Sequence, residues 1–115
     1  MTKHEDIATL SGVGSSDVLG ELPARVVAMC KQRGWSMHWT HRGAYLHLEA
    51  SELIEAIRGK HGDPAEEAGD VLLVLMSITE YAGIPFWKVV DKAVAKLTHL
   101  ENAPHYPGEE YTPNA

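Results

Sequence analysis

Two pairs of acidic residues carry the clearest chemical signal in this sequence. Glu49 and Glu52 are three positions apart. Glu67 and Asp70 repeat that spacing after fourteen intervening residues. Residues three apart lie on one face of a helix, so each pair directs its carboxylates the same way. Converging anions repel one another or take up protons unless a hard divalent cation binds them, so the pattern favours a Mg²⁺ site, with Mn²⁺ as the substitute.

A compact stop-and-restart signal, KHGDP, separates the two pairs. Gly59 and Gly62 can end one helix, Asp63 can cap the next, and Pro64 suits its first position. Glu66, three residues after Asp63, predicts a capping box. We therefore expect two antiparallel helices. Both pairs then lie about 9 Å from the turn, because a helix rises about 1.5 Å per residue.

Acidic residues are also common on solvated helix faces, so an ordinary surface is the alternative to a metal site. The apolar surroundings favour the metal. Leu53, Ile54 and Ile57 accompany the first pair, and Asp70 leads directly into the apolar run 71–76. That run is apolar on every side, which predicts a buried helix. An acid at the start of such a helix is costly unless something pairs with it.

The ExxE…ExxD pattern, with its Gly/Asp/Pro hairpin and the apolar helix after it, resembles the MazG-like nucleoside triphosphate pyrophosphohydrolases. The resemblance extends from about Trp35 to Lys96 and is closest to the short dCTP-pyrophosphatase-like members. It implies an all-α, four-helix fold completed by oligomerisation, as a homodimer or homotetramer. It also implies hydrolysis of a (deoxy)nucleoside triphosphate to the monophosphate and pyrophosphate, and a role in clearing the nucleotide pool.

The resemblance also implies roles for individual residues. Both acid pairs would hold the metal, with Glu49 or Glu52 instead orienting the attacking water as a base. Lys60, Lys92 and Lys96 would stabilise charge on the departing pyrophosphate. Lys60 and Lys92 match family lysines in position. Lys96 stands where an asparagine is expected in the dCTP-pyrophosphatase-like members. This departure leaves the phosphate contacts and the exact substrate undetermined.

The segment 35–45, WSMHWTHRGAY, is rich in aromatic residues and histidine. Trp35, His38, Trp39 and His41 could form a wall that binds the base, because aromatic faces stack on any nucleobase. A similar segment lines the base pocket of the dCTP-pyrophosphatase-like members. Alternatively, these residues only cover one end of the helical core. His38 and His41 have a spacing suited to zinc, but no further ligands accompany them.

Composition limits the alternatives. The chain has 115 residues, a net charge of −6 and one cysteine. Without a basic stripe, a nucleic-acid polymer is not the expected partner. Cys30 cannot form an intrachain disulfide, fits a reducing cytoplasm and is expected in the core. Neither a signal peptide nor a membrane-spanning run is apparent.

Helical spacing and breaker residues predict one domain at 16–102, between a flexible lead-in at 1–15 and an extended tail at 103–115. Its helices are expected from 16 or 23 to 33, from 43 or 44 to 58, from 64 to 82, and from 85 to 100. Two alternative functions come from other classes of protein. A di-iron bundle needs Glu-x-x-His motifs, which the chain lacks. A non-catalytic helical dimer acting as an adaptor would leave the acids merely solvated.

Overall fold

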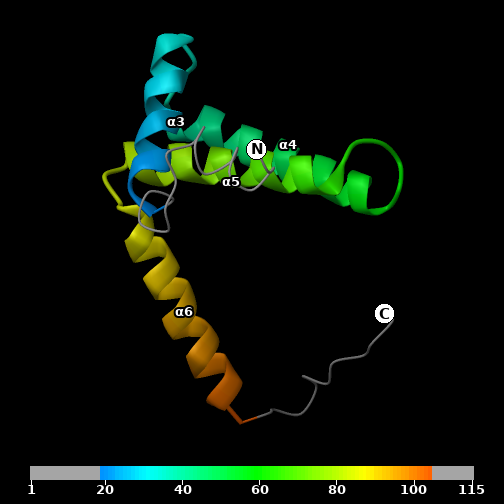
Figure 1. The fold of residues 1–115 in the computed structure, drawn as a ribbon, viewed down its shortest axis with the longest axis vertical. Coiled ribbons are helices and arrows are strands. Elements are labelled where there is room, and N and C mark those ends of the chain that lie inside the picture. The colour runs from blue at the N-terminus through cyan, green and yellow to red at the C-terminus, as the bar shows by residue number, and fades with distance from the viewer. Residues whose placement is uncertain (1–18, 105–115) are drawn as a thin grey trace, which may run out of the picture.

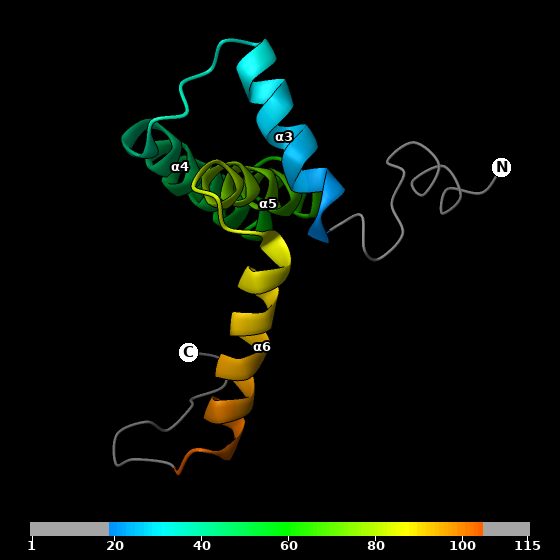
Figure 2. The same ribbon diagram turned by 90° about the vertical axis from the view of Figure 1, so that its left-hand side faces the viewer.

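The structure, a computed structural model, describes residues 19–104 of the chain. Every regular element in this part is a helix, which confirms the all-α prediction. The helices are α3 (Glu21–Gln32), α4 (Trp39–Ile57), α5 (Pro64–Tyr81) and α6 (Phe86–Asn102). α4 and α5 form an antiparallel pair, α3 packs across it, and α6 leads away from it (Figure 1; Figure 2). The lead-in 1–15 and the tail beyond residue 104 lie outside the described residues.

The turn between α4 and α5 forms much as the sequence predicts. Gly59 and Gly62 adopt φ angles of 79° and 88°, in the left-handed region that favours glycine. The Asp63 carboxylate caps α5 by accepting a hydrogen bond from the Ala65 amide at 3.2 Å. The expected capping box is wrong, because within the described chain the Glu66 carboxylate accepts no hydrogen bond from the Asp63 amide.

Two helix starts differ from the prediction. α4 begins at Trp39, several residues early, because His38 serves as its N-cap: the imidazole Nδ1 accepts a hydrogen bond from the Thr40 amide at 3.2 Å. α3 begins at Glu21, since Pro23 is tolerated in the first helical turn, where amides have no helical partner. The alternative start at residue 16 lies outside the described residues.

A small core forms where α3 crosses α5. Val26, Val27 and Cys30 of α3 are buried, as are Val74 and Met76 of α5. Cys30 is free and 1% exposed, as expected of a core residue. The burial predicted for residues 71–76 is incomplete within one chain: Leu72 and Leu73 remain 39% and 38% exposed, because α3 and α4 together cover only part of the α5 surface.

α6 contacts the other helices only near its beginning. Phe86 is buried, whereas Val94, Leu97 and Leu100 are each more than half exposed. In both ribbon views α6 points away from the rest of the molecule (Figure 1; Figure 2). Among the described residues, no single helix is long and apolar enough to cross a membrane, and α5 and α6 pass that test only as a pair bent by 111°.

The turn glycines allow a matched test of how the hairpin positions Glu67. Alanine at Gly59 or Gly62 should cost about 1–2 kcal/mol, because a Cβ is disfavoured at positive φ. At Gly62 the new Cβ would also lie 3.1 Å from Glu67 Oε1, whereas nothing lies within 4 Å at Gly59. Thermal melts should therefore rank Gly62→Ala as the less stable variant. Equal melting temperatures would show that Glu67 moves aside freely.

Candidate metal and substrate site

Three glutamates from two helices meet near the turn of the hairpin. One carboxylate oxygen from each of Glu49, Glu52 and Glu67 lies within 4.8 Å of the other two. α4 contributes the first two side chains, and α5 contributes the third because the turn at residues 58–63 reverses the chain. The three side chains are partly buried. The convergence expected from the spacing therefore occurs for these three acids.

Asp70 lies one helical turn after Glu67 on α5. Its carboxylate is not among the three that meet, but its charge raises the pKa of both Glu49 and Glu67. It also lines a cavity together with Glu49. Asp70 therefore lies next to the three glutamates, and we call Glu49, Glu52, Glu67 and Asp70 together the acid cluster.

Burial and mutual repulsion disturb the titration of the cluster. Burial is the largest cause of the raised pKa of Glu49, followed by the negative charges of Glu52 and Asp70. The pKa of Glu67 is raised for the same reasons. A hydrogen bond with Glu52 contributes to both shifts, and such a bond between carboxyl groups requires a proton on one of them. Without a cation, the cluster therefore tends to hold protons.

Two oxygens of the cluster have no partner. Glu49 Oε2 and Glu67 Oε2 are buried and, within the described chain, accept no hydrogen bond. Buried carboxylate oxygens are normally hydrogen-bonded or bound to a cation. Oxygen atoms from several carboxylates at this spacing suit a hard divalent ion such as Mg²⁺ or Mn²⁺. The residues present therefore fit a metal of that class.

A cavity of about 240 Å³ lies between α3 and the hairpin and reaches the acid cluster at Glu49 and Asp70. A second, of about 220 Å³, shares Trp35, Arg42, Glu49 and Val74 with it and adds Tyr45. We call these two adjacent spaces together the inner cavity. Trp35, expected to bind the base, thus lies in the same cavity as the acids.

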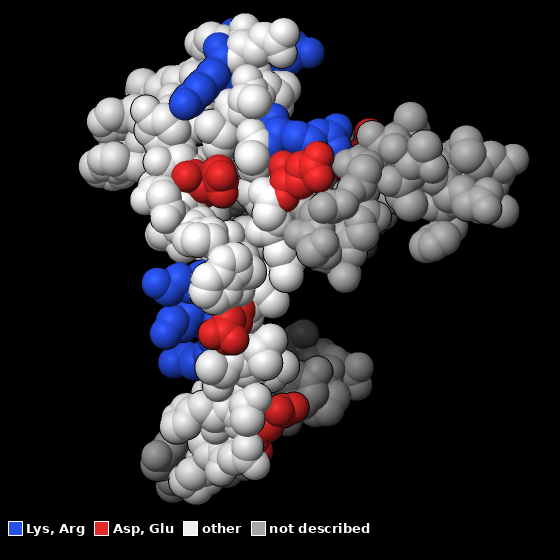
Figure 3. Space-filling view, turned by 60° about the vertical axis from the view of Figure 1, so that its left-hand side comes forward, with Lys and Arg blue, Asp and Glu red and all other residues white. Residues whose placement is uncertain are grey.

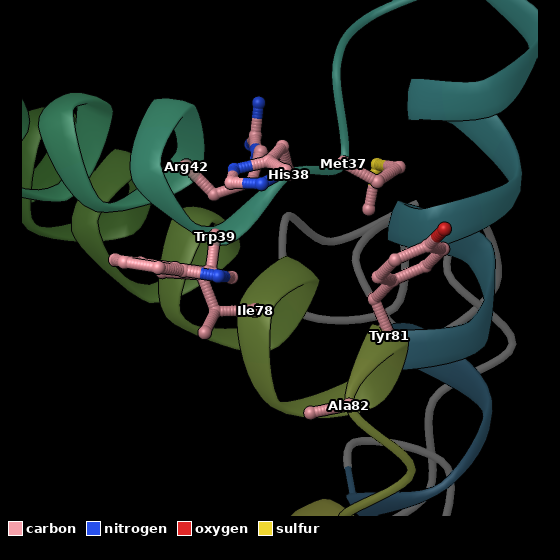
Figure 4. A pocket seen from close by; sticks show the side chains of 7 residues that line it. All are labelled: Met37, His38, Trp39, Arg42, Ile78, Tyr81 and Ala82. Atoms are coloured by element: carbon pink, nitrogen blue, oxygen red, sulfur yellow. The ribbon is translucent and has the colours of Figure 1, made fainter.

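The other predicted base-binding residues lie elsewhere. His38 and Trp39 line a separate hollow of about 500 Å³, with Trp39 and Tyr81 on opposite sides (Figure 4). The His41 Nδ1 atom is 2.6 Å from the Ser36 hydroxyl, and the His38 Nδ1 atom is 2.7 Å from that of Thr40. These local hydrogen bonds give the two histidines structural roles at the start of α4.

The predicted phosphate-binding lysines are not gathered around the acids in one chain. Lys60 is exposed in the turn between α4 and α5. Lys92 and Lys96 are exposed on α6, where the basic side chains form a column on one side of the helix (Figure 3). Lys92 borders a separate hollow at the beginning of α6. Every charged group that shifts the pKa of Glu49 or Glu67 is itself a carboxylate.

Arg42 and Tyr45 were not singled out from the sequence, although both line the inner cavity. The available signal was their spacing: Arg42, Tyr45 and Glu49 are separated by three and then four residues, which puts them on one face of α4. An arginine on the face that carries the acids is unusual because that face is partly buried.

Comparison with known families identifies the chain. A family model described as the MazG nucleotide pyrophosphohydrolase domain matches residues 40–105, more than half of the sequence. The chain belongs to this family. Searches of curated proteins and of solved structures found no match. The matched region contains the whole acid cluster and α6, but Trp35, His38 and Trp39 precede it.

Membership makes this MazG-family chain a nucleoside triphosphate pyrophosphohydrolase, a hydrolase that acts on phosphoanhydride bonds. The adaptor interpretation is correspondingly disfavoured. The acid cluster is the site in the described chain where several metal-binding side chains converge.

The raised pKa values predict how stability changes with pH when no metal is bound. The folded state holds more protons than the unfolded state between the ordinary glutamate pKa and the raised values. The free energy of unfolding should therefore fall as pH rises through that window. Glu67→Gln should raise the melting temperature in EDTA by a few degrees at pH 7 and by little at pH 4.

Glu101→Gln is the matched control, since it removes one charge from the exposed end of α6. It should leave the pH dependence unchanged. If Glu67→Gln lowered the melting temperature at pH 7, repulsion would not dominate the cluster.

Proposed function

We propose that this protein hydrolyses a (deoxy)nucleoside triphosphate to the monophosphate and pyrophosphate in a Mg²⁺-dependent reaction, with Mn²⁺ as a substitute. The observation that carries the proposal is the convergence of three partly buried carboxylates, two with unpartnered oxygens, beside an aromatic cavity. Glu49, Glu52, Glu67 and Asp70 would hold the metal. Such an ion would offset the negative charge of the phosphates and lower the pKa of the attacking water.

The carboxylates of the cluster also supply a base. Glu49 is our candidate for that base because its pKa is raised, its Oε2 atom has no hydrogen-bond partner in the described chain, and, unlike Glu67, it lines the inner cavity. A raised pKa makes a carboxylate a stronger proton acceptor, so Glu49 can take a proton from a water directed at the phosphorus. Glu52 lies close to both Glu49 and Glu67 and adds to the rise in their pKa values.

The departing pyrophosphate needs cations, and in the described part of one chain the predicted lysines are not gathered at the acid cluster. We propose that Lys60, Lys92 and Lys96 serve in a homodimer or homotetramer, where α6 of one copy approaches the hairpin of another. Support comes from the exposed apolar side chains Val94 and Leu97 beside the lysines of α6. Size-exclusion chromatography with light scattering tests this, and a strictly monomeric active enzyme would contradict it.

Base binding is assigned to the aromatic residues that precede the matched domain. Trp35 lies in the inner cavity with the acids and is the principal stacking residue. His38 and Trp39 form an outer wall at the neighbouring hollow, with His41 beside His38, and resemblance to the dCTP-pyrophosphatase-like members supports this arrangement. The free, buried Cys30 suits a reducing cytoplasm, where we place the protein. The proposed activity there would clear the nucleotide pool.

The acid cluster can be tested directly. Glu52→Gln or Asp70→Asn should reduce Mg²⁺-dependent pyrophosphate release by at least 10²-fold, because each removes a charge that holds the cation. Circular dichroism should remain helical. Pyrophosphate release from a panel of nucleotides is the assay, with Glu101→Gln as a control of equal charge change. Wild-type turnover in either variant would refute the metal assignment.

The aromatic wall predicts an effect on binding more than on chemistry. Trp35→Ala should raise KM roughly tenfold while kcat changes little, because stacking, worth about 1–3 kcal/mol per base, acts on ground and transition states alike. Trp39→Ala should have the smaller effect, since Trp39 is 74% exposed. Steady-state kinetics beside a thermal melt distinguish the two roles. Early melting with unchanged KM would indicate that Trp35 only covers the core.

A further inference from the structure

Arg42 is a buried cation without an anionic partner. It is 5% exposed, and its Nε and Nη2 atoms donate to the Ser77 hydroxyl at 3.2 and 3.1 Å. Its guanidinium carbon lies 5.4 Å from the centre of the Tyr45 ring. In the described part of the chain, no carboxylate forms an ion pair with it. A guanidinium carries five N–H donors, so the donors that Ser77 does not take remain available.

Ser77 fixes the direction of this side chain. Its hydroxyl donates to the Val74 carbonyl at 2.6 Å and therefore presents its oxygen to Arg42. Ser77 itself is completely buried and does not line the inner cavity. Burying a guanidinium is costly unless its donors find acceptors. A ligand in the cavity that Arg42 lines would supply them.

The position of Arg42 along α4 suggests which part of a nucleotide it meets. Arg42 and Glu49 lie on one helical face about 10.5 Å apart, at a rise of about 1.5 Å per residue. Both line the inner cavity, and the lining between them includes Trp35, Tyr45 and Val74. With the phosphates at the acids, a nucleoside extending along this aromatic and apolar lining brings its base to Arg42.

We propose that Arg42 recognises a carbonyl oxygen on the edge of the nucleobase and thereby selects guanine or pyrimidine nucleotides over adenine nucleotides. Guanine, cytosine, thymine and uracil carry ring carbonyl oxygens that accept hydrogen bonds, and adenine carries none. Arginine forms bidentate hydrogen bonds to the O6 and N7 atoms of guanine in other proteins. The proposal rests on the proposed function, because it takes the acid cluster as the phosphate end of the site.

Arg42→Lys in the full-length protein is the test, since lysine keeps the charge and most of the volume but loses the planar fork. The readouts are kcat/KM for dGTP, dCTP, dTTP and dATP, and calorimetric binding of the corresponding monophosphates in EDTA. Wild type should favour at least one carbonyl-bearing base over adenine. The variant should lose roughly tenfold or more of that preference while its dATP kinetics change little.

Two further variants keep the test decisive. Arg58→Lys is the matched control, because Arg58 is exposed and pairs with Glu55 at the end of the same helix. Ser77→Ala releases Arg42 without altering the cavity lining and should lower the same preference in part, which decides the matter if Arg42→Lys fails to fold.

Three results would overturn the proposal: a wild type that does not disfavour adenine, an unchanged preference in the variants, or an equal loss for every base. An equal loss would indicate that Arg42 holds a phosphate instead. If the wild type hydrolysed no triphosphate, the proposed function would fail, whereas monophosphate binding in EDTA would still test Arg42 separately.

Discussion

The close approach of like charges from two helices is the constraint on which the rest of the structure depends. Glu49, Glu52 and Glu67 lose hydration and repel one another, which raises the pKa of Glu49 and Glu67. α4 and α5 nevertheless pack against each other, and apolar side chains of both, Ala56 of α4 and Val74 and Met76 of α5, are buried in the fold. Apolar packing therefore offsets the repulsion among the carboxylates. A bound cation would relieve that repulsion, so the repulsion favours cation binding.

The position of the acids follows from the geometry of a short turn. Gly62 lies so close to Glu67 that a Cβ there would be 3.1 Å from a carboxylate oxygen. Asp63 caps the helix that carries Glu67. A change of one residue in turn length would rotate α5 by about 100°, since a helix has 3.6 residues per turn, and would direct Glu67 away from α4. The length and residues of the turn therefore determine whether Glu67 reaches the other acids.

Acidic and basic side chains occupy different parts of α4. Its acid-bearing middle adjoins the cavity reached by Glu49, and its first turn supplies Arg42, held by Ser77 across the interface with α5. A nucleotide has the same polarity, with anionic phosphates that need a cation and a base that offers acceptors. The exposed apolar side chains of α6, Val94, Leu97 and Leu100, lie apart from this site.

Spacing alone determined the helical class, the hairpin and the convergence of Glu49, Glu52 and Glu67, because i,i+3 periodicity and Gly/Asp/Pro signals act locally. Tertiary structure decided the rest. The early start of α4 depends on a histidine cap, which sequence patterns describe poorly. Only packing could separate Trp35 from His38 and Trp39, since neighbours in sequence face different cavities. The contact between Arg42 and Ser77 spans 35 residues, so no local pattern could reveal it.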